Sequence, residues 1–153
     1  MIKSTKTTLS FLNKGKQSQV NSFIEEYRNV VKQFIDLLWG EQKIPTLLPK
    51  SITSQIQTWL SARMIQCAGK QASGIVRGTK KKQEKREWKI NDFIKKGMPK
   101  KARKLQRIYD NVNLSKPKVK AIHPELDSRF IKINLNSETS FDGWVTLGSI
   151  GNK

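Results

Sequence analysis

The chain has 153 residues and carries 30 Lys and Arg against 12 Asp and Glu, a net charge of +18 that attracts polyanions, nucleic acid first among them. A single cysteine and a single histidine exclude an internal disulfide, a cysteine-rich zinc site and a histidine-based metal cluster within the chain. Because no apolar run approaches the roughly 20 residues that span a bilayer, and the start has no apolar signal core, we expect a cytoplasmic protein with no membrane partner.

The first third of the chain predicts a strand followed by a long helix. Residues 3–12, KSTKTTLSFL, are rich in Thr and Ser and alternate weakly toward their end, which favours a strand. Residues 13–16, NKGK, predict a turn. From residue 17 to residue 39, apolar side chains recur at i, i+3, i+4 and i+7, the pattern of an amphipathic helix, and Gly40 is placed to cap its end.

A second amphipathic helix is predicted from Ser51, a good N-cap, to about residue 72. Its apolar stripe includes Trp59, Met64 and Cys67. The opposite, polar face carries Arg63, Gln66 and Lys70. Since a loop of about ten residues joins the two helices, we expect them to pack as a hairpin.

The middle of the chain is a distinct basic segment. Residues 77–120 hold 17 basic and 4 acidic residues, net +13, whereas residues 121–153 are net −1. Gly74 and Gly78 are expected to loosen the start of this segment. Residues 79–96 and 99–111 predict two helices, interrupted by Gly97 and Pro99, and residues 115–120 predict an extended stretch.

The end of the chain predicts two strands, residues 129–135 and 144–150, joined by a polar turn at 136–140. The strand at residues 3–12 cannot form a sheet by itself, so its partners must come more than about a hundred residues later. The expected fold class is therefore α+β, with the helices inserted into a β domain.

Candidate catalytic residues are few. The closest grouping of acids is Glu125 with Asp127 beside His123, which gives a metal site as one interpretation and a polar loop leading into a strand as the favoured one. Cys67 lies on an apolar helix face, where a small buried hydrophobe is favoured over a nucleophile. No glycine-rich phosphate loop is present. The sequence thus predicts no catalytic residue, no metal and no cofactor.

The basic segment supplies the candidate nucleic-acid-binding residues, because Lys and Arg meet phosphates and give salt-dependent affinity. Trp88 and Tyr109 are candidates for stacking on bases, although packing in a core is the favoured interpretation of both. A solvated helix or a disordered tail is the alternative for the charge run. The candidates are Arg63, Gln66, Lys70, Arg77, Lys80, Lys81, Lys82, Lys85, Arg86, Lys89, Lys100, Lys101, Arg103, Lys104 and Arg107.

The closing residues, ELDSRFIKINLNSETSFDGWVTLGSIGNK, resemble a stretch of the RNA-guided nucleases of the TnpB type and of the compact type V CRISPR effectors. That family has a strand followed by a phrase of the form Phe-x-x-Trp-Ile/Val-x-Leu-Gly/Ser-Ser/Thr-Leu/Ile. The phrase is filled here by Phe141, Trp144, Val145, Leu147, Gly148, Ser149 and Ile150. The family's helix with an LPS-x-Ile/Leu/Val-x-Gln start is matched loosely by Leu48, Pro49, Ser51, Ile52 and Gln55, and residues 3–39 resemble its first strand and first helix.

The resemblance covers most of the chain through short, degenerate motifs. It implies that residues 1–13 are the first strand of a wedge-type β-barrel, that residues 14–112 form an inserted helical recognition lobe, and that residues 121–153 are wedge strands of a barrel that is only partial here. It also implies that the partners are guide RNA with its scaffold and target DNA, read mainly by backbone and shape.

The family's RuvC-like nuclease domain and its zinc-binding cysteines have no counterpart in this chain. The resemblance therefore implies a truncated or split protein that is not itself an enzyme, with a separately encoded nuclease portion as a further partner. Two other functions stay open at this point. One is a stand-alone basic RNA- or DNA-binding protein, such as a phage regulator or a ribosome-associated protein. The other is a small enzyme acting on nucleic acid through Glu125 and Asp127.

Overall fold

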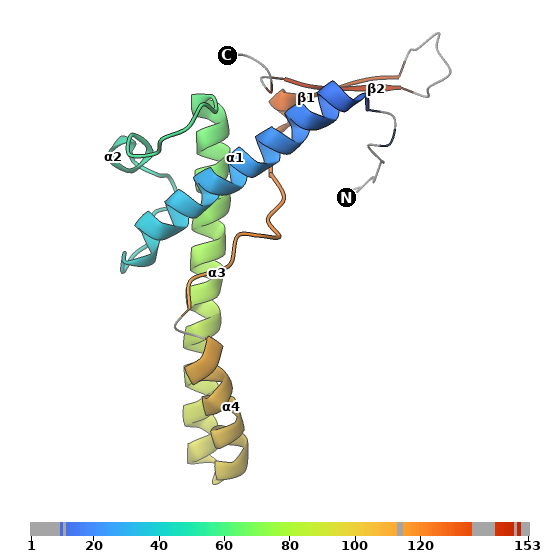
Figure 1. Ribbon diagram of the computed structural model, residues 1–153. Helices are drawn as coiled ribbons and strands as arrows, with labels where there is room; N and C mark the ends of the chain where they lie inside the picture. The colour runs from blue at the N-terminus through green and yellow to red at the C-terminus, as the bar shows by residue number, and fades with distance from the viewer. Residues whose placement is uncertain (1–9, 11, 113–114, 136–142, 149, 151–153) are drawn as a thin grey trace.

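The computed structural model describes residues 10, 12–112, 115–135, 143–148 and 150 (Figure 1). These residues form an α+β structure that is mostly helical and has one two-stranded antiparallel sheet, so the predicted fold class is confirmed at this level. The predicted strand at residues 3–12 and the turn at 136–140 fall almost wholly outside the described residues. Within the described ranges the sheet contains only β1 and β2, and no barrel is formed.

The first helix, α1, spans Lys14–Trp39 and confirms the long helix predicted for residues 17–39. It begins three residues earlier than predicted because Asn13 caps it: the Asn13 side-chain oxygen accepts a hydrogen bond of 2.9 Å from the backbone N–H of Lys16. The predicted turn at residues 13–16 is therefore the first turn of the helix. The buried stripe of α1 comprises Phe23, Tyr27, Val30, Val31, Phe34, Ile35 and Leu38.

The second helix, predicted as one element over residues 51–72, is interrupted: residues 62–72 are helical as predicted, but residues 54–61 are not. Helix α2 spans only Lys50–Thr53, residues 54–61 are not helical, and α3 begins at Ala62 with Ser61 as its N-cap. Tertiary contacts replace the helical hydrogen bonds in this interval. The side-chain amide of Gln33 donates to the carbonyl of Gln57 and accepts from its N–H, both at 3.1 Å. Ile56 and Leu60 are buried in the core from this irregular segment.

Helix α3 spans Ala62–Lys95 without interruption, so the expected loosening at Gly74 and Gly78 is wrong. A glycine inside a helix costs only about 1 kcal/mol relative to Ala, and a 34-residue helix packed along its first half offsets that cost. At 1.5 Å per residue, α3 is about 51 Å long. Residues 62–72 of one predicted helix and residues 79–95 of the next thus belong to a single continuous helix.

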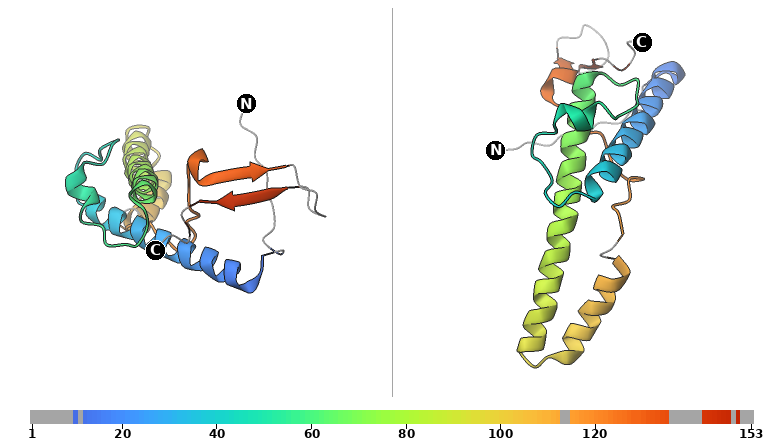
Figure 2. Two further views of the ribbon diagram at one scale, coloured as in Figure 1. Left: turned by 90° about the horizontal axis from the view of Figure 1, so that it is seen from above. Right: turned by 90° about the vertical axis from the view of Figure 1, so that its left-hand side faces the viewer.

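The core lies where α1 crosses the first half of α3, whose buried face is Met64, Ala68, Ala72 and Val76. A Cβ atom at Gly69 would collide with Cδ1 of Leu48 and lie 3.2 Å from Cζ of Phe34, so the glycine permits the close approach of both side chains to α3. Two contacts follow the same order along both helices. Phe34 of α1 lies beside Gly69 of α3, and further along, the carbonyl of Glu41, just after α1, accepts a hydrogen bond from the ammonium of Lys80 of α3. Both helices therefore run in the same general direction, and the expected antiparallel hairpin is wrong (Figures 1 and 2).

After α3 the chain turns back and packs against the second half of α3 as helix α4. Helix α4 spans Pro99–Val112 and confirms the helix predicted for residues 99–111. Gly97 adopts a φ of 65°, and the N–H groups of Gly97 and Met98 donate to the carbonyls of Ile94 and Phe93 at 3.0 and 2.9 Å. This is a Schellman termination, which the Gly-Met-Pro sequence favours because glycine accepts a positive φ. We call residues 77–112 the arm.

The arm projects beyond the crossing with α1, on the side away from the sheet (Figure 1). Its two helices are held together by the buried side chains of Ile90 and Ala102, with Phe93 and Leu105 half-buried. Such a thin interface orders the hairpin but leaves most of its surface to solvent.

The chain returns from the arm to the sheet along an irregular segment, residues 115–127. Side chains of the helices hold its backbone: the hydroxyl of Tyr27 donates to the carbonyl of Glu125 at 3.1 Å, and Nε of Arg28 donates to the carbonyl of Ile122 at 2.8 Å. Burial raises the pKa of Tyr27, which keeps the phenol protonated as a donor. The segment is thereby fixed against α1 and α3 without secondary structure of its own.

A short 3-10 helix, Ser128–Phe130, leads into β1, Ile131–Asn134, which pairs antiparallel with β2, Trp144–Leu147. Both strands were predicted, and both are shorter than expected. The register pairs Ile131 with Leu147 and Ile133 with Val145, which puts all four side chains on one face. All four are exposed. The described part of the chain therefore leaves an apolar sheet face uncovered.

Candidate nucleic-acid interface

One face of α3 carries cations along almost its whole length. The predicted residues Arg63, Gln66 and Lys70 are exposed on the side opposite the core residues Met64 and Ala68. Steps of three, four or seven residues return to the same side of an α-helix, so the same side continues into the arm. We call it the outer face of α3; it comprises Arg63, Gln66, Lys70, Arg77, Lys81, Lys85, Trp88 and Lys95, all exposed.

This face is continuous only because α3 is unbroken. From Arg63 to Lys95 it extends about 48 Å at 1.5 Å per residue. Two acids, Glu84 and Asp92, lie among its cations, and Asp92 forms an ion pair of 2.9 Å with Lys96 at the end of the arm. The net charge of the face stays positive. The structure thus joins two groups of predicted residues, one near residue 66 and one near residue 85, into a single track.

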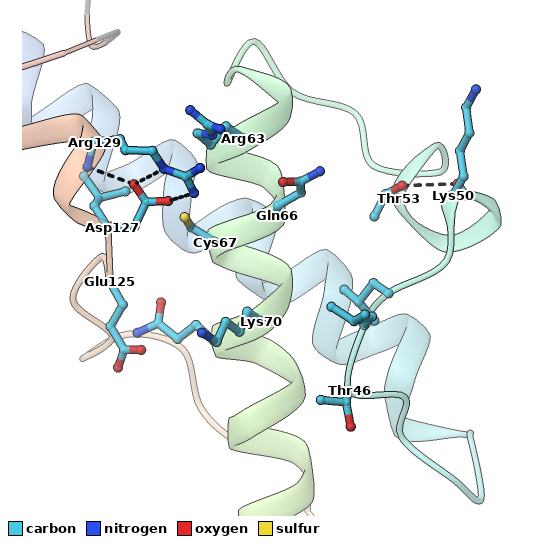
Figure 3. A pocket seen from close by; sticks show the side chains of 14 residues that line it. Thr46, Lys50, Thr53, Arg63, Gln66, Cys67, Lys70, Glu125, Asp127 and Arg129 are labelled. Atoms are coloured by element: carbon cyan, nitrogen blue, oxygen red, sulfur yellow. Dashed lines mark hydrogen bonds and ion pairs between the residues drawn. The ribbon is translucent and has the colours of Figure 1, made fainter.

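The first turns of α3 also form the floor of a groove of about 1020 Å³. Figure 3 shows Arg63, Gln66 and Lys70 on successive turns, with Lys50 and Thr53 on one side and Glu125, Asp127 and Arg129 on the other. The lining cations are Lys50, Arg63, Lys70 and Arg129, against the two carboxylates of Glu125 and Asp127. The groove is therefore suited to an anionic ligand along its α3 side.

The two acids of the metal hypothesis lie at the edge of this groove. Nε of Arg129 donates to Oδ1 of Asp127 at 3.0 Å, and Nη2 of Arg129 also binds its other oxygen. These hydrogen bonds lower the pKa of Asp127 from 3.8 to about 2, so the carboxylate is occupied by Arg129. Among the described residues, His, Cys, Asp and Glu side chains form no group of three or more that would hold a metal ion.

The two single-copy residues are placed separately. Cys67 is half-buried, packs against the core and lines the groove, so the prediction of a buried position holds in part. The His123 side chain is exposed, and its backbone carbonyl accepts a hydrogen bond of 2.8 Å from the amide of Gln71. Among the described contacts, neither Cys67 nor the His123 side chain has a neighbouring base or acid that would suit nucleophilic chemistry.

The second cationic surface lies on α4. Ala102 is buried and Leu105 and Tyr109 are half-buried on the side toward α3, whereas Lys100, Arg103, Lys104 and Arg107 are exposed on the opposite side. We call these four cations the outer face of α4. Lys101 is exposed on its flank. The sequence alone suggests cations on nearly all sides of this helix; the packing of α4 on α3 reduces that to one outward stripe.

The charges of α4 oppose its own helix dipole. Its first turn contains no acid and includes Lys100 and Lys101, near the positive end of the dipole. Its last turn contains no basic residue and includes the acid Asp110, near the negative end. Lys100 with Lys104, and Arg103 with Arg107, are like-charged pairs at i, i+4, each unfavourable by about 0.2–0.5 kcal/mol. An anion bound along this face would remove the repulsion.

Two predicted binding residues are used inside the protein instead. Lys80 is half-buried; its ammonium donates to the carbonyl of Glu41 and lies 6.0 Å from the centroid of the Trp39 ring. Arg86 is half-buried and lies on the same side of α3 as the buried Ile90, which is the side that faces α4. Lys82 and Lys89 are exposed and flank the outer face of α3.

The two aromatic candidates differ. Trp88 is 65% exposed, so the favoured interpretation of a core position is wrong for it. Tyr109 is half-buried on the side of α4 that faces α3, in agreement with the packing role. Only Trp88 offers an open ring face on the arm.

Four further cations were not among the sequence candidates. Lys95 and Lys96 end α3 at the turn and are exposed next to the start of α4. The sequence KKGMPKK around a predicted helix stop was the signal that could have found them. Lys50 and Arg129 line the groove from other segments of the chain, and no sequence pattern predicted that they would lie near residue 66.

Comparisons with protein-family models, curated proteins and solved structures find no match to this chain. Within the described residues, no helix combines the length and apolar character needed to cross a membrane. The charges and geometry of the two outer faces are therefore the features of this chain that point to a function.

Proposed function

We propose that this chain binds nucleic acid along the outer faces of α3 and α4. The observation that carries the proposal is the single cationic face of α3, about 48 Å long, together with four outward cations of α4 on the opposite side of the arm. Cations at these positions neutralise phosphates and release counterions, which supplies most of the affinity of sequence-independent binding.

The energetics of the arm support a polyanionic partner. Its charges repel each other and oppose the dipole of α4, so they lower the stability of the free protein. A surface selected for stability alone would intersperse acids among them. The core needs none of the cations on the outer faces, since Ile90, Ala102 and the α1–α3 contact hold the structure together.

In its finer form the proposal is that the chain is the RNA- and DNA-binding lobe of an RNA-guided DNA endonuclease of the TnpB or type V CRISPR type. Its support is the motif resemblance, together with helices that lie between the start of the chain and the closing strands. In this proposal the groove and the arm hold the guide RNA scaffold and the guide–target heteroduplex, and the nuclease chemistry belongs to a separately encoded portion.

The finer proposal also includes a partial wedge-type barrel, built from residues 1–13 and the closing strands. The exposed apolar face of Ile131, Ile133, Val145 and Leu147 supports further strands or a partner at this sheet, because such a face is rarely left to solvent. The four-residue α2 argues the other way, since the matched LPKSIT stretch opens no long helix here.

The binding proposal is tested with two variants of equal charge. The arm variant replaces Lys100, Arg103, Lys104 and Arg107 by Ala. The control variant replaces Lys14, Lys16, Lys32 and Lys43, four exposed cations outside the arm. Fluorescence anisotropy with labelled single-stranded RNA, RNA duplex and DNA duplex should show weaker binding by the arm variant than by the control. Equal affinities of the two variants would refute binding through α4.

The finer proposal is tested by the coding sequence that follows the codon for Lys153. A nearby frame that encodes a further wedge strand, a carboxylate-bearing nuclease domain and paired cysteines would support it, and reconstitution with that portion should give RNA-dependent DNA cleavage. An unrelated downstream sequence would favour the stand-alone RNA- or DNA-binding protein, for which the anisotropy result would still hold.

A further inference from the structure

Trp88 is the most exposed of the four tryptophans of the chain, at 65% against 45% for Trp144 and 42% for Trp59, while Trp39 is half-buried. It lies on the outer face of α3, on the side of the arm that faces away from α4. The arm is held together by Ile90 on the opposite side. Trp88 thus contributes little to the folding of the arm.

The neighbours of Trp88 on the outer face are three cations and two acids, of which Glu84 lies one turn before it. Lys85 precedes it by one turn, and Lys81 and Lys95 lie two turns away on either side, all on the same face and all exposed. Asp92, one turn after Trp88, is engaged by Lys96. A single exposed apolar side chain is common on protein surfaces, so the ring by itself indicates no ligand. The excess of cations over acids beside it favours an anionic one.

We propose that Trp88 is a stacking platform for an unpaired nucleobase, whose strand lies along the outer face of α3 with its phosphates on Lys81, Lys85 and Lys95. This inference rests on the proposed nucleic-acid binding and deepens it, because it names single-stranded nucleic acid as the ligand of this face. Aromatic rings stack on bases of any sequence, whereas the bases of a duplex are already stacked on each other and leave no open face. The cations of α4, which have no exposed aromatic ring among them, then make phosphate contacts only.

The test compares Trp88→Leu and Trp88→Phe with the unaltered chain. Leu keeps an apolar side chain without a ring, and Phe keeps a ring. The probes are single-stranded RNA and single-stranded DNA of about 12 nucleotides, the same strands with abasic sugars, an RNA duplex, and inorganic polyphosphate. Because Trp88 is exposed, both variants should keep the circular dichroism spectrum of the unaltered protein.

We expect Trp88→Leu to weaken binding of the single strand by roughly 5- to 150-fold, the range of one lost base stack. The salt dependence should not change, since no phosphate contact is removed. Trp88→Phe should recover most of the affinity. Binding of the duplex, of polyphosphate and of the abasic strand should be the same for all three proteins. A similar loss for RNA and DNA strands would identify the base alone as the ligand, whereas a loss for RNA only would add recognition of the 2′-hydroxyl.

Equal binding of the single strand by Trp88→Leu and the unaltered chain would overturn the stacking role. So would a loss that is equally large for the abasic strand, because that would make Trp88 important only for the shape of the arm. The binding proposal fails separately: it requires the arm variant to lose affinity for polyphosphate and RNA alike, whatever Trp88 does. Quenching of tryptophan fluorescence by the strand should also disappear in Trp88→Phe and persist in Trp59→Phe.

Discussion

The outer face of α4 predicts a specific change in the salt dependence of RNA binding. The arm variant removes Lys100, Arg103, Lys104 and Arg107, four exposed cations within two turns of one helix face. Each phosphate contact contributes a slope of about −0.7 in log K against log salt for a single strand and about −0.9 for a B-form duplex. If all four contact phosphates, the slope should become less steep by about 2.8 for a single strand and about 3.6 for duplex DNA.

The magnitude follows from the range of salt. Between about 50 and 200 mM salt, a slope difference of about 2.8 to 3.6 changes the affinity ratio of the two proteins by roughly 50- to 150-fold. The arm variant should therefore bind far more weakly at low salt and approach the unaltered chain at high salt. Anisotropy titrations at four or more salt concentrations, with circular dichroism to verify folding, measure both slopes.

The control variant makes this prediction refutable. Replacing Lys14, Lys16, Lys32 and Lys43 lowers the net charge by the same amount, so any long-range effect of charge is equal in the two variants. The control slope should change by less than about one unit. If the slopes of the two variants change equally, the affinity depends on net charge alone and the outer face of α4 is not a contact surface.

The remaining predictions concern the fold that presents these faces. Gly97→Ala should destabilise the arm by about 1–2 kcal/mol, because its φ of 65° is unfavourable for any residue with a Cβ, whereas Gly78→Ala, in open space within α3, should stabilise it by about 0.5–1 kcal/mol; thermal melts of equal midpoint would contradict this. Phe34→Ala removes a fully buried ring and should cost about 3–5 kcal/mol in urea unfolding, and a loss below about 1 kcal/mol would argue against the core described here. Arg129 lowers the pKa of Asp127 from 3.8 to about 2, so the stabilising effect of this pair should be complete above pH 3.8 and be lost as the pH falls through about 2; carboxyl NMR titration of Asp127 with a midpoint near 3.8 would show that the contact is not formed in solution.

Local chemistry was enough to predict the elements that carry their own signals. The apolar period of residues 17–39 predicted α1. Gly97 and Pro99 predicted the interruption between α3 and α4, because glycine accepts the positive φ that ends a helix and proline is favoured at the first position of the next. Alternation predicted both closing strands, and the register then followed their apolar side chains. The excess of cations in residues 77–120 likewise needed no structure to be recognised.

Long-range contacts decided what local signals could not. Residues 54–61 have a helical apolar period, yet they are irregular because Gln33 binds the backbone of Gln57 and Ile56 and Leu60 fill the core from that conformation. Gly74 and Gly78 were expected to loosen the chain, yet packing against α1 and α4 on either side of them keeps α3 continuous.

The site shows the same division between sequence and structure. The sequence alone determined that the chain is strongly basic and that its cations concentrate in the middle, because charge is summed over the residues of a segment and needs no coordinates. Only the tertiary structure decided which cations share a face: it turned Lys80 and Arg86 inward, brought Arg129 to the groove, and aligned Arg63 with Lys95 and Trp88 along one unbroken helix. That alignment depends on whether α3 continues through two glycines, which is a property of packing rather than of the residues themselves.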